Sequence, residues 1–160
     1  MRDGILIRQY TPDDAAALRT LVLQLHESLR PLDADLAPGA HIIDEHVADV
    51  VQFARDSDGL ILLADDHGRA VGYLCLYGRI TPNDQDELPA PYSFMAELYV
   101  LPEYQRQGIG RELVARAEAH ARELGACKIE LKVLAQNTPA QEFYTALGYA
   151  PRIIVMRKKF

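Results

Sequence analysis

Short apolar runs alternate with stripes of apolar residues at helical spacing along the chain. The first run, residues 4–10, is rich in β-branched side chains and predicts a strand. It ends at Thr11 and Pro12, followed by two aspartates, which is typical of a helix start because Thr can cap, Pro suits the first helical position and acids favour the positive end of the helix dipole. The helical stripe follows at Leu18, Leu21, Val22, Leu25 and Leu29 and ends at Pro31.

A second helix and a group of strands come next. Apolar residues at helical spacing within 43–54 predict a helix that begins near Asp44 and ends near Gly59. A proline-rich loop at residues 81–91 divides the strands that follow. These are predicted at residues 60–64, 70–77 and 92–100, the first two joined as a β-hairpin by a tight polar turn.

The last third of the chain continues the alternation of helices and strands. A helical stripe runs from Ile109 to Leu124 and stops at Gly125. Residues 128–134 predict a fifth strand, a short helix opens at Thr138-Pro139, and residues 153–156 predict a last strand. The expected fold class is therefore α/β, an α+β arrangement with one mixed sheet.

Composition bounds the kind of protein. The 160 residues are 49% hydrophobic and 25% charged, which predicts a single globular domain over residues 1–160 and excludes disordered and fibrous classes. Neither an apolar stretch long enough for a membrane span nor a signal peptide is visible, so we expect a soluble cytoplasmic protein with no membrane partner. Cys75 and Cys127 lie in apolar runs and are expected to be small buried thiols rather than metal ligands or a disulfide.

Charge is divided unevenly along the chain. Residues 1–80 carry 7 Arg against 13 acids, residues 81–102 carry 4 acids and no base, and residues 103–160 carry 10 Lys and Arg against 6 acids. This division suits an anionic ligand held by the C-terminal half and a cationic one received by the N-terminal half, although solvated faces would give the same pattern. No basic patch with interleaved aromatics is present, so nucleic acid is not an expected partner.

The segment that carries chemical information joins the end of a strand to the start of a helix. It reads Val-Leu-Pro-Glu-Tyr-Gln-Arg-Gln-Gly-Ile-Gly-Arg over residues 100–111. Unpaired N–H groups at a helix start bind anions, and glycine lets a phosphate approach the backbone closely. Arg111 and Glu112 follow Gly110 where a Walker loop needs Lys and Ser or Thr, and the third glycine of a dinucleotide fingerprint is absent.

Gln105-Arg106-Gln107-Gly108-Ile109-Gly110 instead resembles the (Gln/Arg)-x-x-Gly-x-(Gly/Ala) acetyl-CoA signature of the GNAT superfamily of N-acetyltransferases. The strand before it and the segment 137–149 resemble two further parts of the family pattern, so the resemblance covers about residues 94–150. The order of the elements over the whole chain agrees as well.

This resemblance implies a GNAT-type fold, with a central, mostly antiparallel sheet splayed between strands four and five and flanked by about four helices. It implies acetyl-CoA as co-substrate, with the pantetheine arm in the splay and the pyrophosphate on the loop. Asn137 would also serve to cap the helix after it, and Arg106 or Arg111 would equally suit solvated positions. The residues implied for cofactor binding are Leu98, Tyr99, Val100, Gln105, Arg106, Gln107, Gly108, Ile109, Gly110, Arg111, Asn137, Ala140 and Phe143.

Acetyl transfer to an amine needs a base and an acid. Glu97 interrupts an apolar strand and is the candidate base, unless it pairs structurally with an arginine or lies at the sheet surface. Tyr144 matches the position where many family members carry the tyrosine that protonates the departing thiolate, the alternative being an aromatic residue of the core. Both cysteines are expected to be dispensable, because the family generally transfers the acetyl group directly.

The acceptor is expected on the N-terminal side. Residues 1–91 would form the acceptor-side half and residues 92–160 the acetyl-CoA-binding half. The expected acceptor is a primary amine of a small cationic metabolite or antibiotic; the alternatives are a protein N-terminal or lysine acetyltransferase and a non-enzymatic acyl-CoA sensor. No metal is expected, and such folds commonly form homodimers. The residues expected to line the acceptor mouth, unless they are only solvated, are His26, Glu27 and Tyr92, with the loop acids Asp84, Asp86 and Glu87.

Overall fold

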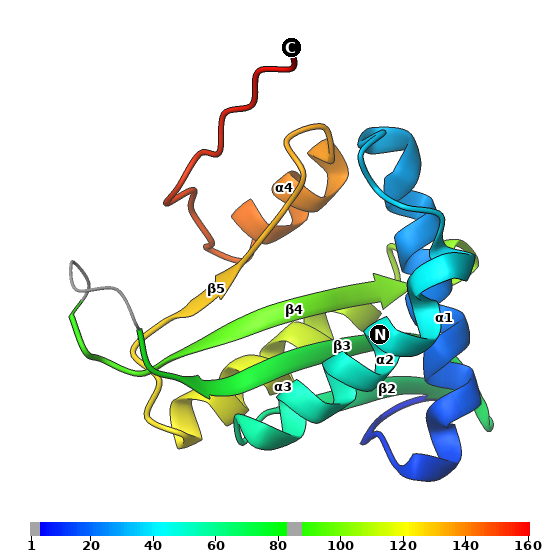
Figure 1. The fold of residues 1–160 in the computed structure, drawn as a ribbon. Helices are drawn as coiled ribbons and strands as arrows, with labels where there is room; N and C mark the ends of the chain where they lie inside the picture. The colour runs from blue at the N-terminus through cyan, green and yellow to red at the C-terminus, as the bar shows by residue number, and fades with distance from the viewer. Residues whose placement is uncertain (1–3, 83–87) are drawn as a thin grey trace.

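The computed structural model describes residues 4–82 and 88–160 (Figure 1). Within these residues the strands form one sheet in the order β1-β2-β3-β4-β5, antiparallel from β1 to β4 and parallel between β4 and β5. This mixed, mostly antiparallel sheet confirms the expected fold class. The strands are β1 Ile5–Gln9, β2 Leu60–Asp66, β3 Arg69–Ile80, β4 Tyr92–Val100 and β5 Ile129–Leu131, and the α-helices are α1 Ala15–Leu29, α2 Gly39–Asp56, α3 Ile109–Glu123 and α4 Thr138–Thr145.

Helices cover both faces of the sheet. Figure 1 shows α2 in front of the sheet and α3 behind it. The ring centroids of Phe53 on α2 and Tyr77 on β3 are 4.4 Å apart. Successive side chains of a strand point to opposite faces of the sheet. Tyr73 and Tyr77 therefore face α2, whereas Leu74 and Leu76 face α3. The large, fully buried side chains that complete the core include Leu18, Ile43, Leu63, Ile109 and Leu113.

The centre of the sheet contains two irregularities that lie side by side. Consecutive residues of β3, Cys75 and Leu76, pair with Glu97 and Met95 of β4, so Ala96 is an extra residue in a β-bulge. β5 pairs with β4 only as far as Met95 and then turns away toward α4 (Figure 1). The backbone of β4 beyond Met95 consequently has no strand partner on the β5 side within the described residues. The splay expected between the fourth and fifth strands is thus confirmed.

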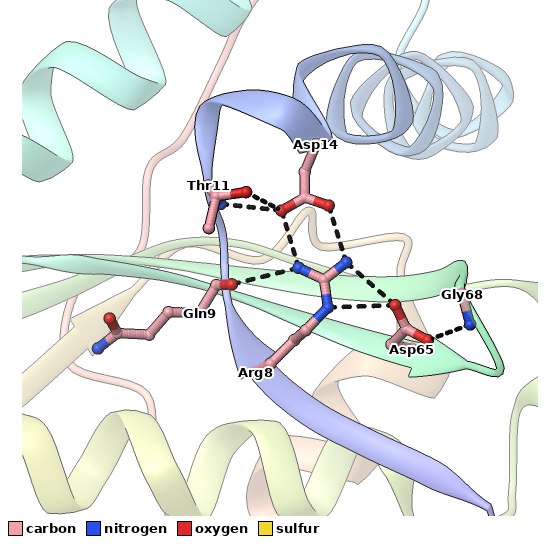
Figure 2. Close-up of polar contacts among 6 residues, drawn as sticks. All are labelled: Arg8, Gln9, Thr11, Asp14, Asp65 and Gly68. Carbon is pink, nitrogen blue, oxygen red and sulfur yellow. Dashed lines mark hydrogen bonds and ion pairs between the residues drawn. The ribbon is translucent and has the colours of Figure 1, made fainter.

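A cluster of charges fixes the N-terminal strand against the hairpin (Figure 2). The guanidinium of Arg8 donates to both oxygens of Asp14 at 2.7 and 2.8 Å and to Asp65 at 3.0 and 3.1 Å. Asp14 also accepts from the backbone N–H of Thr11, and Asp65 from that of Gly68. The Arg8 guanidinium holds the pKa of Asp14 well below its usual range. The cluster ties β1, the start of the first helix and the β2–β3 turn together.

The structure corrects the boundaries of one expected helix and one expected strand. α2 begins at Gly39 rather than near Asp44, because the backbone N–H of Gly39 donates to the Glu27 carboxylate at 2.7 Å and so has a partner at the helix start. The strand expected at residues 128–134 is shortened to β5, since the chain leaves β4 after Leu131.

Two further expectations are wrong. Residues 153–156, expected to form a strand, have no regular structure, because no strand among the described residues lies beside them and a strand needs a hydrogen-bonding partner. Cys127, expected to be buried, is exposed in the turn after α3, whereas Cys75 is buried as expected. Burial raises the pKa of the Cys75 thiol far above its ordinary value, so it stays protonated.

Across the described parts of the chain, residues 4–82 and 88–160, no helix combines the length and the apolar character needed to cross a bilayer.

Candidate active site

The splay exposes one side of β4. Leu98 and Tyr99 are half-buried there, and Val100 is buried at the end of the strand. Unpaired strand edges bind extended polar chains through their N–H and C=O groups. The carbonyl of Val100 accepts from the Gln105 side chain at 2.9 Å, so the loop after β4 is fixed to the end of the strand. The edge can hold an extended ligand whose far end reaches that loop.

The loop 105–111 has the backbone shape of an anion site. Arg106 and Gly108 both have positive φ, 60° and 85°, a conformation that glycine adopts at little cost and arginine rarely adopts. The first hydrogen bond of α3 is accepted by the Gly108 carbonyl, which leaves the N–H groups of the first helical turn without helical acceptors. Ile109 is buried and anchors the helix start, and Arg111 is exposed beside it.

The side chains of Gln105 and Gln107 shape this loop. Gln107 donates to the Glu103 carbonyl at 2.9 Å, as Gln105 does to Val100. Both glutamine side chains therefore have partners within the protein, which leaves the backbone N–H groups at the start of α3 as the loop's candidate donors to an anion.

α4 lies against the start of α3. A Cβ added at Gly110 would stand 3.4 Å from Cζ of Phe143, an ordinary van der Waals contact, so the Phe143 ring lies directly beside the first turn of α3. The side chain of Asn137 accepts from the backbone N–H of Ala140 at 3.3 Å and so caps α4. A capping role is one of the two roles expected for Asn137. Its contact with pantetheine stays a prediction.

Tyr144 extends from α4 to the point where the sheet opens. Its hydroxyl lies 3.8 Å from the sulfur of Met95, and its ring makes edge contacts with those of Phe143 and Tyr149. Burial raises the pKa of Tyr144 to about 12. The phenol is therefore neutral at physiological pH and retains a proton that it can donate.

Glu97 faces the opposite side of the sheet. One carboxylate oxygen, Oε1, is 2.6 Å from Nε2 of His46 on α2, and the other, Oε2, accepts from the Tyr73 hydroxyl at 2.8 Å. Its side chain is only 11% exposed. The hydrogen bond to Glu97 raises the pKa of His46, and burial raises that of Tyr73 well above its ordinary value. A carboxylate held in this way can attract a cation and accept a proton.

His46 and Tyr73 were not identified from the sequence as partners of Glu97. The sequence holds a weak signal for each of them. His46 lies three residues after Ile43 and four before Val50, on the apolar face of the helix, where a polar side chain needs a partner. Tyr73 stands on the same face of β3 as Cys75, which pairs with Glu97.

The residues expected at the acceptor mouth have partners within the chain. His26 lies 2.7 Å from the Ala37 carbonyl, and Glu27 binds the Gly39 N–H and Arg30, so both connect the end of α1 to the start of α2. Tyr92 lies under the ammonium of Lys128. Their binding of an acceptor stays a prediction. Asp84, Asp86 and Glu87 lie outside the described residues.

Within residues 4–82 and 88–160, no group of three or more His, Cys, Asp or Glu is arranged to hold a metal ion.

Comparison with known proteins gives a family and several relatives. The sequence profile of the Acetyltransferase (GNAT) family matches residues 24–149. The aminoglycoside N(6')-acetyltransferase type 1 of Stenotrophomonas maltophilia is 29% identical over 154 residues, which cover 94% of this chain and 91% of that protein.

Solved structures share the fold. The aminoglycoside N-acetyltransferase AAC(6')-Iy in complex with CoA has a TM-score of 0.71 at 21% identity, covering 98% of this chain and 95% of that one. A GCN5-related N-acetyltransferase from Ralstonia eutropha has a TM-score of 0.77 at 20% identity, covering 98% and 99%.

Proposed function

Because the chain belongs to the GNAT family of acetyltransferases, we propose that it transfers the acetyl group of acetyl-CoA directly to a primary amine of a small cationic molecule. The observation that carries this proposal is the position of Glu97. Glu97 follows Met95, the last β4 residue that pairs with β5, by two residues. Its carboxylate lies on the sheet face opposite Tyr144. In the proposal, the candidate base and the candidate acid lie on either side of this opening in the sheet.

The reaction explains why both groups are needed. An alkylammonium with a pKa of about 10.4 is only about one part in a thousand neutral at pH 7.4, and deprotonating it costs about 4 kcal/mol. Glu97 attracts the ammonium and takes the proton that the amine must lose, directly or through water. The CoA thiol has a pKa of about 8.5, so a proton donated by Tyr144 assists departure of the sulfur.

GNAT enzymes use acetyl-CoA as donor, and the C-terminal half supplies the groups suited to it. In the proposal, the pantetheine arm lies along the open edge of β4 at residues 98–100. The pyrophosphate lies on the N–H groups of residues 105–111, with Arg106 and Arg111 exposed beside it. The ring of Phe143 forms one wall of this site.

The acceptor is proposed to be a polyamine-like or aminoglycoside-like cation. The relative from Stenotrophomonas maltophilia carries the name of an aminoglycoside acetyltransferase. In this chain, Asp49 lies one helical turn beyond His46 and adds negative charge on the α2 side of Glu97. An acidic opening favours a molecule with several ammonium groups over a neutral peptide.

The test is release of the CoA thiol from acetyl-CoA with aminoglycosides, polyamines, amino acids and short peptides as acceptors. Saturable release with an aminoglycoside or polyamine, abolished in Glu97→Gln, supports the proposal. Release with peptides alone would instead identify a protein acetyltransferase. Binding of acetyl-CoA without turnover on any acceptor would identify an acyl-CoA sensor.

We also propose that the chain forms a homodimer through residues 153–156. These four apolar residues are 70–88% exposed, although their side chains are typical of a buried strand. Arg152 pairs with Glu130 on β5 at 2.7 Å, and Lys159 pairs with Asp35 at 2.7 Å, so the segment is held at both ends. β5 ends the strand order and leaves an outer edge that a strand of a second copy can join.

A further inference from the structure

We propose that His46 relays to solvent the proton that Glu97 takes from the acceptor amine. This inference rests on the proposed function, because it assigns a path to a proton that only amine acetylation releases. His46 acts through Glu97 and is a positioning and relay residue rather than a group that touches the reacting atoms.

The two partners of Glu97 differ in what they can do with a proton. Tyr73 is fully buried, and burial raises its pKa well above the ordinary value, so its hydroxyl remains a donor to Oε2. The imidazole of His46 has two nitrogens, and one of them lies 2.6 Å from Oε1. Of these two side chains, only His46 can take up a proton on one side and release it on the other.

Exposure gives the relay its direction. The side chain of Glu97 is 11% exposed, whereas that of His46 is 39% exposed. A bound acceptor and acetyl-CoA would cover Glu97 further, which closes the direct route from its carboxylate to water. The more exposed ring of His46, on α2, would then be the route from the carboxylate to water.

The charges around His46 shift its pKa and so set the pH range in which it can accept a proton. Glu97 on β4 is the largest influence and Asp49 on α2 adds to it, and both raise the pKa of His46, whereas burial of the ring lowers it. Tyr73, Cys75 and Tyr77 line the same face of β3 and are neutral at physiological pH, because burial raises the pKa of each. The pKa of His46 is therefore raised above the ordinary histidine value of 6.5.

The protons and bonds balance in this scheme. The acceptor arrives as an ammonium and gives one proton to Glu97, and its nitrogen lone pair forms the bond to the acetyl carbon. As the C–S bond breaks, the thiolate takes a proton from Tyr144, and the second nitrogen proton restores the phenol. Glu97 passes its proton to Nε2 of neutral His46, and Nδ1 releases one to water. The products are the amide, CoA thiol and one proton.

The relay makes a specific prediction for the pH dependence of kcat/KM. Neutral His46 is the form that accepts a proton, so the wild-type rate should rise as pH increases through the raised pKa of His46. In His46→Gln the side chain can still hydrogen-bond Glu97 but cannot carry a proton. We expect kcat to fall roughly 10- to 100-fold, the acceptor KM to change less than threefold, and this limb of the pH profile to disappear.

Chemical rescue separates a relay from a purely structural contact. Added imidazole should restore His46→Ala at least tenfold, in proportion to its neutral fraction. His41→Gln is the matched control: His41 is an exposed histidine of the same helix, and its replacement should leave rate and pH profile unchanged. A His46→Gln rate within twofold of wild type with the same pH limb would overturn the relay. So would a slow His46→Ala that imidazole does not restore.

An NMR titration tests the pair without any turnover. The His46 ring should titrate above 6.5 in the wild type and at least half a pH unit lower in Glu97→Gln, because the charge that favours the imidazolium is gone. An unchanged midpoint would overturn the relay even if acetyl transfer is observed. Conversely, wild-type protein with no activity on any amine would overturn the proposed function, whatever the titration shows.

Discussion

The hydroxyl of Tyr144 lies 3.8 Å from the sulfur of Met95, the last residue of β4 that pairs with β5. A side chain from the helix after β5 thus reaches back to the strand at the residue where the sheet opens. The departing sulfur of CoA would lie in that opening if pantetheine follows the free edge of β4.

Replacing Tyr144 by Phe should lower kcat roughly 10- to 100-fold with little change in the acetyl-CoA KM, because the ring keeps its packing and only the proton donor is lost. The wild-type rate should show no loss from ionisation of this phenol below about pH 11, since its pKa is about 12. Steady-state kinetics of CoA release measure both.

Tyr149→Phe is the matched control, since Tyr149 contacts the Tyr144 ring but donates its own hydroxyl to Glu118. It should retain the wild-type kcat. An equal fall in kcat in Tyr144→Phe and Tyr149→Phe would contradict the role of Tyr144 as the acid.

The loop glycine Gly108 can be compared with a second glycine at the other end of α3. Gly108 and Gly125 have φ of 85° and 74°, so alanine at either position should cost about 1 kcal/mol of unfolding free energy. Only Gly108→Ala adds a Cβ beside the proposed pyrophosphate site. We expect its acetyl-CoA KM to rise about tenfold.

Urea denaturation and donor titrations of both variants check this prediction. If Gly125→Ala raised the acetyl-CoA KM as much as Gly108→Ala does, strain alone would explain the effect and the loop would lose its proposed role.

The Arg8–Asp14 pair should make stability depend on acid pH. Because Arg8 lowers the pKa of Asp14 in the folded state, the pair contributes stability above the unfolded pKa of about 4 and loses it as pH falls through the lower folded value. Asp14→Asn should cost about 1–3 kcal/mol at pH 7. Its stability should then decline less than that of the wild type between pH 5 and pH 2.

Urea unfolding at several pH values measures this difference, with the exposed neighbour Asp13→Asn as control. If the unfolding free energies of wild type and Asp14→Asn changed in parallel with pH, the Arg8–Asp14 pair would not be a source of the acid sensitivity.

The proposed dimer predicts that Ile154→Asp, which places a charge in the exposed apolar segment, shifts the protein to the monomer mass of 17.9 kDa. Sedimentation at several concentrations should give a dimer for the wild type and for Leu6→Asp, an exposed leucine of β1. A wild-type monomer up to about 100 µM, a concentration at which specific interfaces of standard size are saturated, would rule the dimer out.

Features encoded by neighbouring residues could be predicted from the sequence, and features that depend on distant partners could not. The start of α3 follows from a glycine and an adjacent apolar stripe, both local. The start of α2 depends on Glu27, which lies twelve residues before Gly39. The pairing of His46 with Glu97 spans 51 positions, and it arises only when α2 packs on the sheet.

The strand wrongly predicted at residues 153–156 also shows that local sequence does not reveal distant partners. Its side chains have the local preference for a strand, but pairing needs a second backbone, and no strand within residues 4–82 and 88–160 lies beside it. The loop proposed to bind the cofactor could be predicted as a candidate because its glycines and helix start are contiguous in the sequence. The cluster of His46, Tyr73 and Glu97 proposed for the acceptor side could not, because it is assembled from α2, β3 and β4.

The extra residue Ala96 has a consequence for how this enzyme can change over time. In a regular strand Met95 and Glu97 would share a face, yet the bulge turns them to opposite sides, one toward Tyr144 and the other toward α2. In the proposed function, donor chemistry and acceptor recognition thus occupy separate surfaces of one strand. If the proposed function holds, substitutions on α2 would alter the amine that is accepted while the thioester side stays intact, so new acceptors would be acquired without rebuilding catalysis.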